Sequence, residues 1–134
     1  MHFELDGEQI HEIEGLKSPD TKTPPVTLEE LEVDCEGEPV LEELLREVVD
    51  KCLAYTITVA KFKKIVTLKD KSWDDSREEI ETVRTSSHDA MISAVNLLSR
   101  ELSSRDRDIS WASEFGGERV KYARFALTLT LSRI

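Results

Sequence analysis

Apolar side chains between residues 41 and 66 follow a helical repeat. Successive members are four and three residues apart in alternation, which places them along one side of a helix: Leu41, Leu45, Val48, Cys52, Tyr55, Val59, Phe62 and Val66. The β-branched stretch at 55–59 also suits a strand, but the repeat continues through it without a turn signal. The pattern therefore predicts one helix over 40–68.

A second long helix is predicted over 73–103. Ser72 is a suitable N-cap, and Asp74 and Asp75 place negative charge in the first turn. Two apolar stripes follow at helical spacing, one through Ile80 and Leu97 and one through Met91 and Leu102. The two helices would be about 42 and 46 Å long, and such matched lengths predict an antiparallel hairpin.

A shorter third helix is predicted over 118–133, after a short turn that begins at Ser110 and ends at Gly116-Gly117. The segment 124–132 also alternates with period two, so a strand is the competing interpretation there. The predicted fold class is all-α. A long hairpin and a third helix would form a three-helix bundle or a dimeric four-helix-type bundle.

Charge and helix breakers divide the chain near Pro39. Residues 1–38 hold twelve acids and two bases, so the whole net charge of −10 lies on them. All four prolines occur by position 39, and residues 40–115 contain neither Gly nor Pro. We therefore expect an acidic, partly disordered arm over 1–38 and a helical bundle domain over 39–134.

Within the arm, Asp6-Gly7 between short alternating runs predicts a β-hairpin. Thr27 and Glu30 have the spacing of a capping box, which would start a short helical turn. Residues 16–26 are expected to be poorly ordered. Apolar arm residues are expected to dock on the helices, with acids near a set of lysines; these residues are Phe3, Leu5, Ile10, Lys61, Lys63, Lys64, Lys69 and Lys71.

Composition excludes several classes of protein. No apolar run is long enough to span a membrane, and the acidity argues against direct binding to a nucleic-acid backbone. Cys35 and Cys52 are the only cysteines, too few for a disulfide framework or a zinc cluster. We expect a cytoplasmic protein without a cofactor, in which Cys52 is a core residue and Cys35, among acids, a poor nucleophile.

If the protein is an enzyme, its carboxylates are better candidates for catalytic residues than its cysteines or His88. Glu43, Glu47 and Asp50 share one helix face, and acids on two helices could hold Mg²⁺ in an all-α phosphohydrolase. The antiparallel register instead places acids opposite lysines, which favours solvated ion pairs. His88 and Asp89 could also carry acid–base chemistry, but the apolar stripe explains His88 as a residue at its edge. No set of residues forms a recognisable active site.

The function predicted first is therefore a non-catalytic interaction or regulatory protein. Two alternatives stay open: an acidic decoy that mimics nucleic acid toward a basic protein partner, and a small Mg-dependent phosphohydrolase. The third helix is too short to cover the long hairpin, so an apolar surface would be left for a homodimer or another partner. Its candidate residues are Val49, Leu53, Ile57, Ala60, Met91, Val95 and Leu98.

Overall fold

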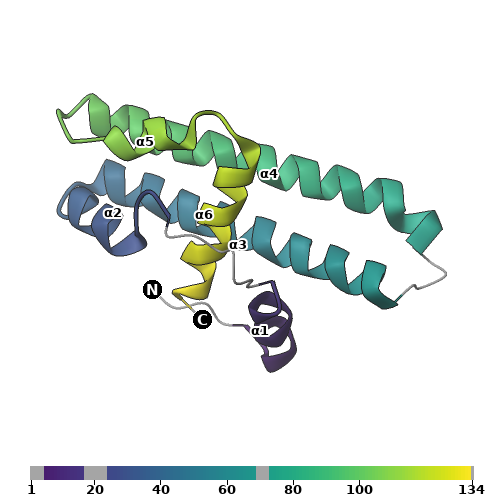
Figure 1. The fold of residues 1–134 in the computed structure, drawn as a ribbon. Helices are drawn as coiled ribbons and strands as arrows, with labels where there is room; N and C mark the ends of the chain where they lie inside the picture. Colours follow the sequence, from purple (N-terminus) through teal and green to yellow (C-terminus); the bar gives the residue numbers. More distant parts are fainter. Residues whose placement is uncertain (1–4, 17–23, 69–72, 134) are drawn as a thin grey trace.

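The computed structural model describes residues 5–16, 24–68 and 73–133. These ranges form six helices and no strand, so the all-α prediction is confirmed at that level. The helices are α1 (Gly7–Glu14), α2 (Leu28–Cys35), α3 (Pro39–Leu68), α4 (Trp73–Ser103), α5 (Ser110–Phe115) and α6 (Arg119–Leu131). Figure 1 shows their arrangement.

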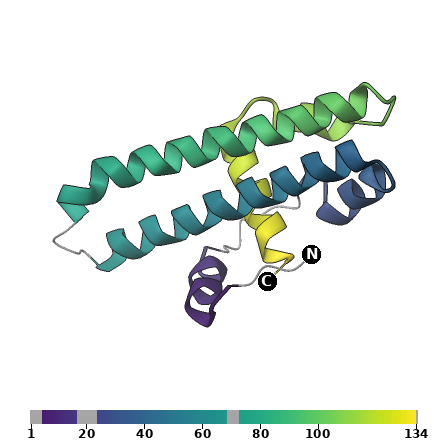
Figure 2. The same ribbon diagram turned by 180° about the vertical axis from the view of Figure 1, so that it is seen from behind.

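The two long helices, α3 and α4, lie side by side and run in opposite directions (Figures 1 and 2). Two side-chain contacts fix their register. The ring of Tyr55 meets the ring of His88 edge-on at 5.0 Å, and the guanidinium carbon of Arg84 lies 4.5 Å from the centroid of the Phe62 ring. The helices begin and end within a residue of the predicted limits, because the apolar repeat and the absence of breakers leave no earlier stopping point.

The smaller helices gather on one side of the α3–α4 pair. Seen from behind, the pair lies in front and α6 crosses beyond it (Figure 2). The turn into α6 uses Gly116 and Gly117, whose φ values of 56° and 71° suit glycine. The segment 124–132 lies within α6 apart from its last residue, which is the C-cap, so the strand alternative is wrong.

Aromatic rings from α5 and α6 close the core. Phe115 stacks on Tyr122 with 4.5 Å between ring centroids, and it meets Phe125 edge-on at 5.6 Å. Trp111 packs against Phe115 from the preceding turn at 6.1 Å. These rings belong to the same buried cluster as side chains of α3 and α4, so α5 and α6 are fixed to the hairpin mainly by apolar burial.

The start of the acidic arm is helical, and the β-hairpin prediction is wrong. Asp6 caps α1 by accepting a hydrogen bond from the Gln9 backbone N–H, and the Gln9 side chain accepts one from the Asp6 N–H. Ile13 is 1% exposed, whereas Leu5 and Ile10 are half-buried. A capping box satisfies two backbone donors at once, and this outweighs the turn preference of Asp-Gly.

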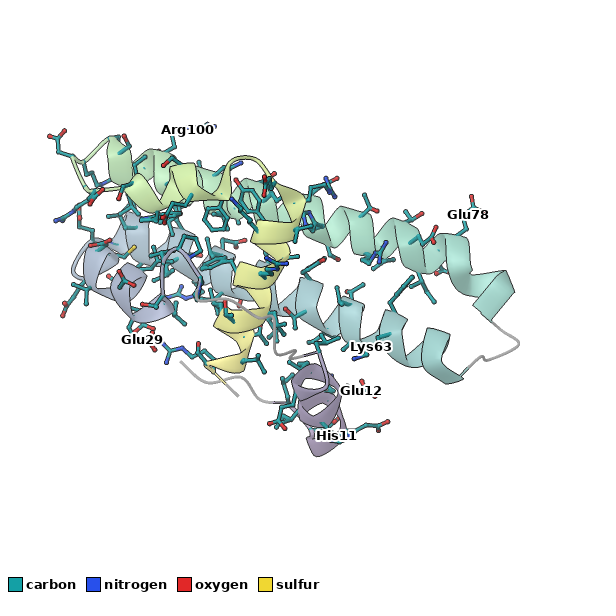
Figure 3. The ribbon with its side chains drawn as sticks, in the orientation of Figure 1. His11, Glu12, Glu29, Lys63, Glu78 and Arg100 are labelled. Atoms are coloured by element: carbon teal, nitrogen blue, oxygen red, sulfur yellow. The ribbon has the colours of Figure 1, made fainter. Side chains whose placement is uncertain are left out.

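One of the lysines expected to contact the arm's acids, Lys63, contacts the residue after α1 instead. Lys63 Nζ donates a hydrogen bond of 2.7 Å to the carbonyl oxygen of Gly15, and Figure 3 shows Lys63 on the side of α3 that faces α1. The acceptor is a backbone group rather than an acidic side chain. Phe3, the span 17–23 and the side chains of Lys64, Lys69 and Lys71 lie outside the described residues.

The core continues across the predicted boundary at Pro39. Val26, Leu28, Leu31 and Cys35 are each at most 4% exposed and pack in the same buried cluster as Leu41. The change at Pro39 is thus a change of charge, while residues 26–35 contribute to the packing of the whole chain. No helix in the described ranges combines the length and the apolar character that a membrane span needs.

Candidate protein-binding surface

Helix α2 is built by local sequence signals and presents two different sides. Thr27 and Glu30 form a capping box, in which the Thr27 hydroxyl accepts from the Glu30 backbone N–H at 3.2 Å and the Glu30 carboxylate accepts from the Thr27 backbone N–H at 3.2 Å. Leu28, Leu31 and Cys35 face the core at helical spacing. The other side of the helix carries acids and the exposed Val33.

Ion pairs hold α2 and the start of α3 in place. Glu38, just before α3, is bound by Arg107 at 2.8 Å and by Arg105 at 3.3 Å, one guanidinium on each carboxylate oxygen. The hydrogen bond from Arg107 is the main reason that the pKa of Glu38 lies below its usual value. At the far end of α6, Arg133 pairs with Glu32 of α2. The middle of α2 and the segment between α2 and α3 are therefore each paired with a later part of the chain.

A groove of about 560 Å³ lies between α2 and the first half of α3. Its apolar lining is made by buried side chains of both helices: Leu28, Cys35, Leu45 and Val49. Four acids line it as well: Glu29, Glu32, Glu36 and Glu42. Arg46 is the one basic residue among the described residues of this lining, and its guanidinium is bound to Glu43 at 2.5 Å. Figure 3 labels Glu29 on α2.

A second hollow of about 410 Å³ lies on the other side of α2, against α5. Its acids are Glu30, Asp34, Asp108 and Glu114. Trp111 also lines it and is 7% exposed, and its indole Nε1 has no hydrogen-bond partner among the described residues. A buried N–H donor without an acceptor costs stability, so the indole of Trp111, which lines this hollow, carries an unsatisfied donor.

Val33 joins the two hollows, because it lines both and is 71% exposed. We call the two hollows and Val33 together the α2 face. Its lining contains eight acidic residues and one basic residue. An apolar side chain that stands in water between two acidic hollows is suited to contact with a basic partner that also carries apolar groups.

The two thiols are both buried, in environments that favour their protonated form. Burial, with the nearby charges of Asp34, Glu38 and Glu42, raises the pKa of Cys35 to about 11. Burial also raises the pKa of Cys52, which is fully buried in the core cluster. Neither environment favours the thiolate form that a cysteine nucleophile needs.

The acids proposed for magnesium are not gathered into a metal-binding group among the described residues. Glu43, Glu47 and Asp50 are exposed on α3, and Glu43 is paired with Arg46. Among the described residues, no three His, Cys, Asp or Glu side chains gather closely enough to hold a metal ion. The phosphohydrolase alternative gains no support from this arrangement.

His88 is more buried than an edge position implies. It is 5% exposed because α6 covers it, and its Nε2 lies 3.1 Å from the carbonyl oxygen of Arg119. The neighbouring Asp89 is exposed and pairs with Arg119 at 3.1 Å. The two residues proposed for acid–base chemistry thus both contact the first residue of α6.

The apolar set predicted for a dimer is largely internal to the single chain. Five members are at most 3% exposed: Val49, Ala60, Met91, Val95 and Leu98. Leu53 and Ile57 are half-buried. The length argument counted only the third helix as cover and left out the helices of the arm, α1 and α2. The single chain thus buries most of the set on which the homodimer prediction rested, and the oligomeric state is left to measurement.

The residues of the α2 face were not singled out from sequence, although part of the signal was present. The capping box at Thr27 and the apolar spacing Leu28, Leu31, Cys35 together indicate a helix with one buried side. The residues Asp108, Trp111 and Glu114 come from a distant part of the chain, and only the fold brings them to α2.

Comparison of the chain with protein-family models, curated proteins and solved structures returns no match.

Proposed function

We propose that the chain is a non-catalytic binding protein whose α2 face takes a basic, amphipathic segment of another protein. The observation that carries the proposal is the combination of exposed Val33 with two hollows whose lining holds eight acids and one base. This combines the interaction protein predicted first with the basic partner of the decoy alternative.

Charge and shape set the chemistry of the partner. Its Lys or Arg side chains would meet the acids of the α2 face, which speeds association and selects against acidic competitors. Its apolar side chains would enter the groove beside Leu45 and Val49 and cover Val33. A backbone or side-chain oxygen of the segment would accept the free hydrogen bond of Trp111 Nε1. A uniformly charged polymer could satisfy only the first of these three contacts.

Isothermal titration with two designed helical peptides tests the proposal. One peptide alternates Leu with Lys at amphipathic spacing, and the other has Glu in place of each Lys. We expect the Lys peptide to bind and the Glu peptide not to bind. Binding should weaken steeply as salt is added but persist in part, because the apolar contacts are not screened.

Two variants with one matched control locate the site. Exchanging Glu29, Glu36 and Glu42 for Gln should weaken the Lys peptide by about tenfold or more, and Val33→Ser should weaken it several-fold. The control exchanges three exposed acids outside the α2 face for Gln: Glu47, Glu78 and Glu79. Equal losses in the first set and the control set would show that only net charge matters, and the proposed surface would be wrong.

A further inference from the structure

A small hollow of about 250 Å³ lies where α3, α4 and the first turn of α6 meet. Tyr55 of α3 lines it together with three residues of α4 and three of α6; these are Arg84, Thr85, His88, Arg119, Val120 and Ala123. Figures 1 and 2 show α6 starting beside α4 and crossing α3 at this junction. We call this feature the basic hollow.

The charge of the basic hollow is opposite to that of the protein. Two arginines and a histidine line it, and none of the described residues of its lining is acidic, in a chain of net charge −10. The Arg84 guanidinium lies over the Phe62 ring, and a guanidinium in such a contact can still donate hydrogen bonds from its edge. Arg119 is half-exposed and is paired with Asp89 at 3.1 Å. An anion in the hollow would therefore accept hydrogen bonds from Arg84 and would compete with Asp89 for those of Arg119.

Neutral donors surround the same space. Burial raises the pKa of Tyr55 and the nearby charges of Arg84 and Arg119 oppose this effect, so the phenol stays protonated and lies near both guanidinium groups. Thr85 adds an exposed hydroxyl. Helix α6 has no side-chain cap, and its first intrahelical bonds run from Lys121 and Tyr122 to Glu118. The N–H groups of the residues before Lys121, which include Val120 of the lining, carry the positive end of the helix dipole.

His88 supplies an independent sign of an incomplete site. A carbonyl oxygen only accepts, so the 3.1 Å contact with Arg119 requires the hydrogen on Nε2. The edge-on contact with Tyr55 holds the ring in that orientation. The other nitrogen, Nδ1, is buried and has no hydrogen-bond partner among the described residues. With the hydrogen on Nε2, Nδ1 is an acceptor, so it would take a hydrogen bond from a donor on the ligand, such as the P–OH group of a monohydrogen phosphate.

We propose that the basic hollow binds a phosphate group. Guanidinium groups, hydroxyls and helix N–H groups are the donors that phosphate oxygens accept from in proteins. The volume lies below the range of about 300–1,000 Å³ typical of larger ligand sites, so it suits a phosphate with a small organic group at most. This site is separate from the α2 face and takes a ligand of opposite charge.

Two-dimensional NMR of the full chain, titrated with inorganic phosphate and with phenyl phosphate, tests the proposal. We expect both ligands to shift the backbone signals of Arg119 and Val120 and the ring signals of His88. A tighter fit of phenyl phosphate would identify the ligand as a phosphate monoester, and tighter binding of inorganic phosphate would identify it as free phosphate. No shift of these signals with either ligand would overturn the proposal.

Three variants distinguish phosphate binding in the basic hollow from non-specific attraction of an anion to any surface arginine. Arg84→Gln should weaken binding by about tenfold, the loss expected for one charge-assisted hydrogen bond. Asp89→Asn should tighten binding several-fold, because it frees Arg119 for the ligand. Arg100→Gln, an exposed arginine further along α4 that Figure 3 labels, should bind as the unchanged protein does. Equal affinities in all three variants would overturn the proposal, and the expected gain in Asp89→Asn cannot come from misfolding.

Discussion

Removing the side chain of Leu31 should destabilise the whole protein, although this residue lies in the acidic arm. Leu31 is 1% exposed on the buried side of α2 and belongs to the main core cluster. Leu31→Ala removes a buried isobutyl group and leaves a cavity, and such changes cost about 2–5 kcal/mol. Because α2 has only eight residues and can shift toward the gap, we expect a loss of about 3 kcal/mol.

Val33 is the matched control, since it lies two residues later on the same helix and is 71% exposed. Val33→Ala removes almost no buried surface, and Ala favours helix, so its effect should stay within about 0.5 kcal/mol. Urea unfolding followed by helical circular dichroism measures both. With a slope of about 1.5 kcal/mol per M, Leu31→Ala should lower the midpoint by about 2 M. Equal midpoints for the two variants would refute the packing of α2 in the core.

Three further outcomes are expected. The pKa of Glu38 is lowered in the fold, so its ion pairs stabilise the protein above the unfolded pKa of about 4.3 and are lost as pH falls through the folded pKa. Glu38→Gln should therefore be less stable than the natural protein at neutral pH. Urea unfolding at a pH below the folded pKa should show no difference between the two proteins. Cys35 and Cys52 should react with a thiol reagent at neutral pH only after unfolding, because both are buried with raised pKa values. Light scattering should give a mass near 15.3 kDa, since five of the seven predicted dimer residues are buried in one chain, and twice that mass would restore the predicted dimer.

The long helices could be predicted because their signals are local and repeated. The stripe from Leu41 to Val66 and the N-terminal acids after Ser72 each specify a helix without reference to the rest of the chain. Gly116 and Gly117 mark the break before α6 for the same reason, since the ease of adopting a positive φ is a property of glycine itself. These features account for α3, α4, α5 and α6.

The arm was harder to predict because two local signals competed there. Asp6-Gly7 favours a hairpin, whereas Asp6 with Gln9 favours a helix cap, and the burial of Ile13 against the bundle decides for the helix. The candidate sites lay still further from local sequence. Tyr55, Arg84 and Arg119 meet only because α6 crosses the hairpin, and no spacing of residues along the sequence predicts that crossing.

The most direct test of the central claim is to map where a basic amphipathic peptide binds. Methyl and indole NMR signals of the full chain, followed during titration with the Leu-Lys peptide, report on each surface separately. The account predicts the largest changes at the Val33 methyls and at the Trp111 indole N–H, which line the α2 face. Val83 and Leu97 are exposed apolar residues on α4 and should not respond. Equal changes at Val83 and Leu97, or none at Val33, would contradict the claim that the α2 face binds the partner.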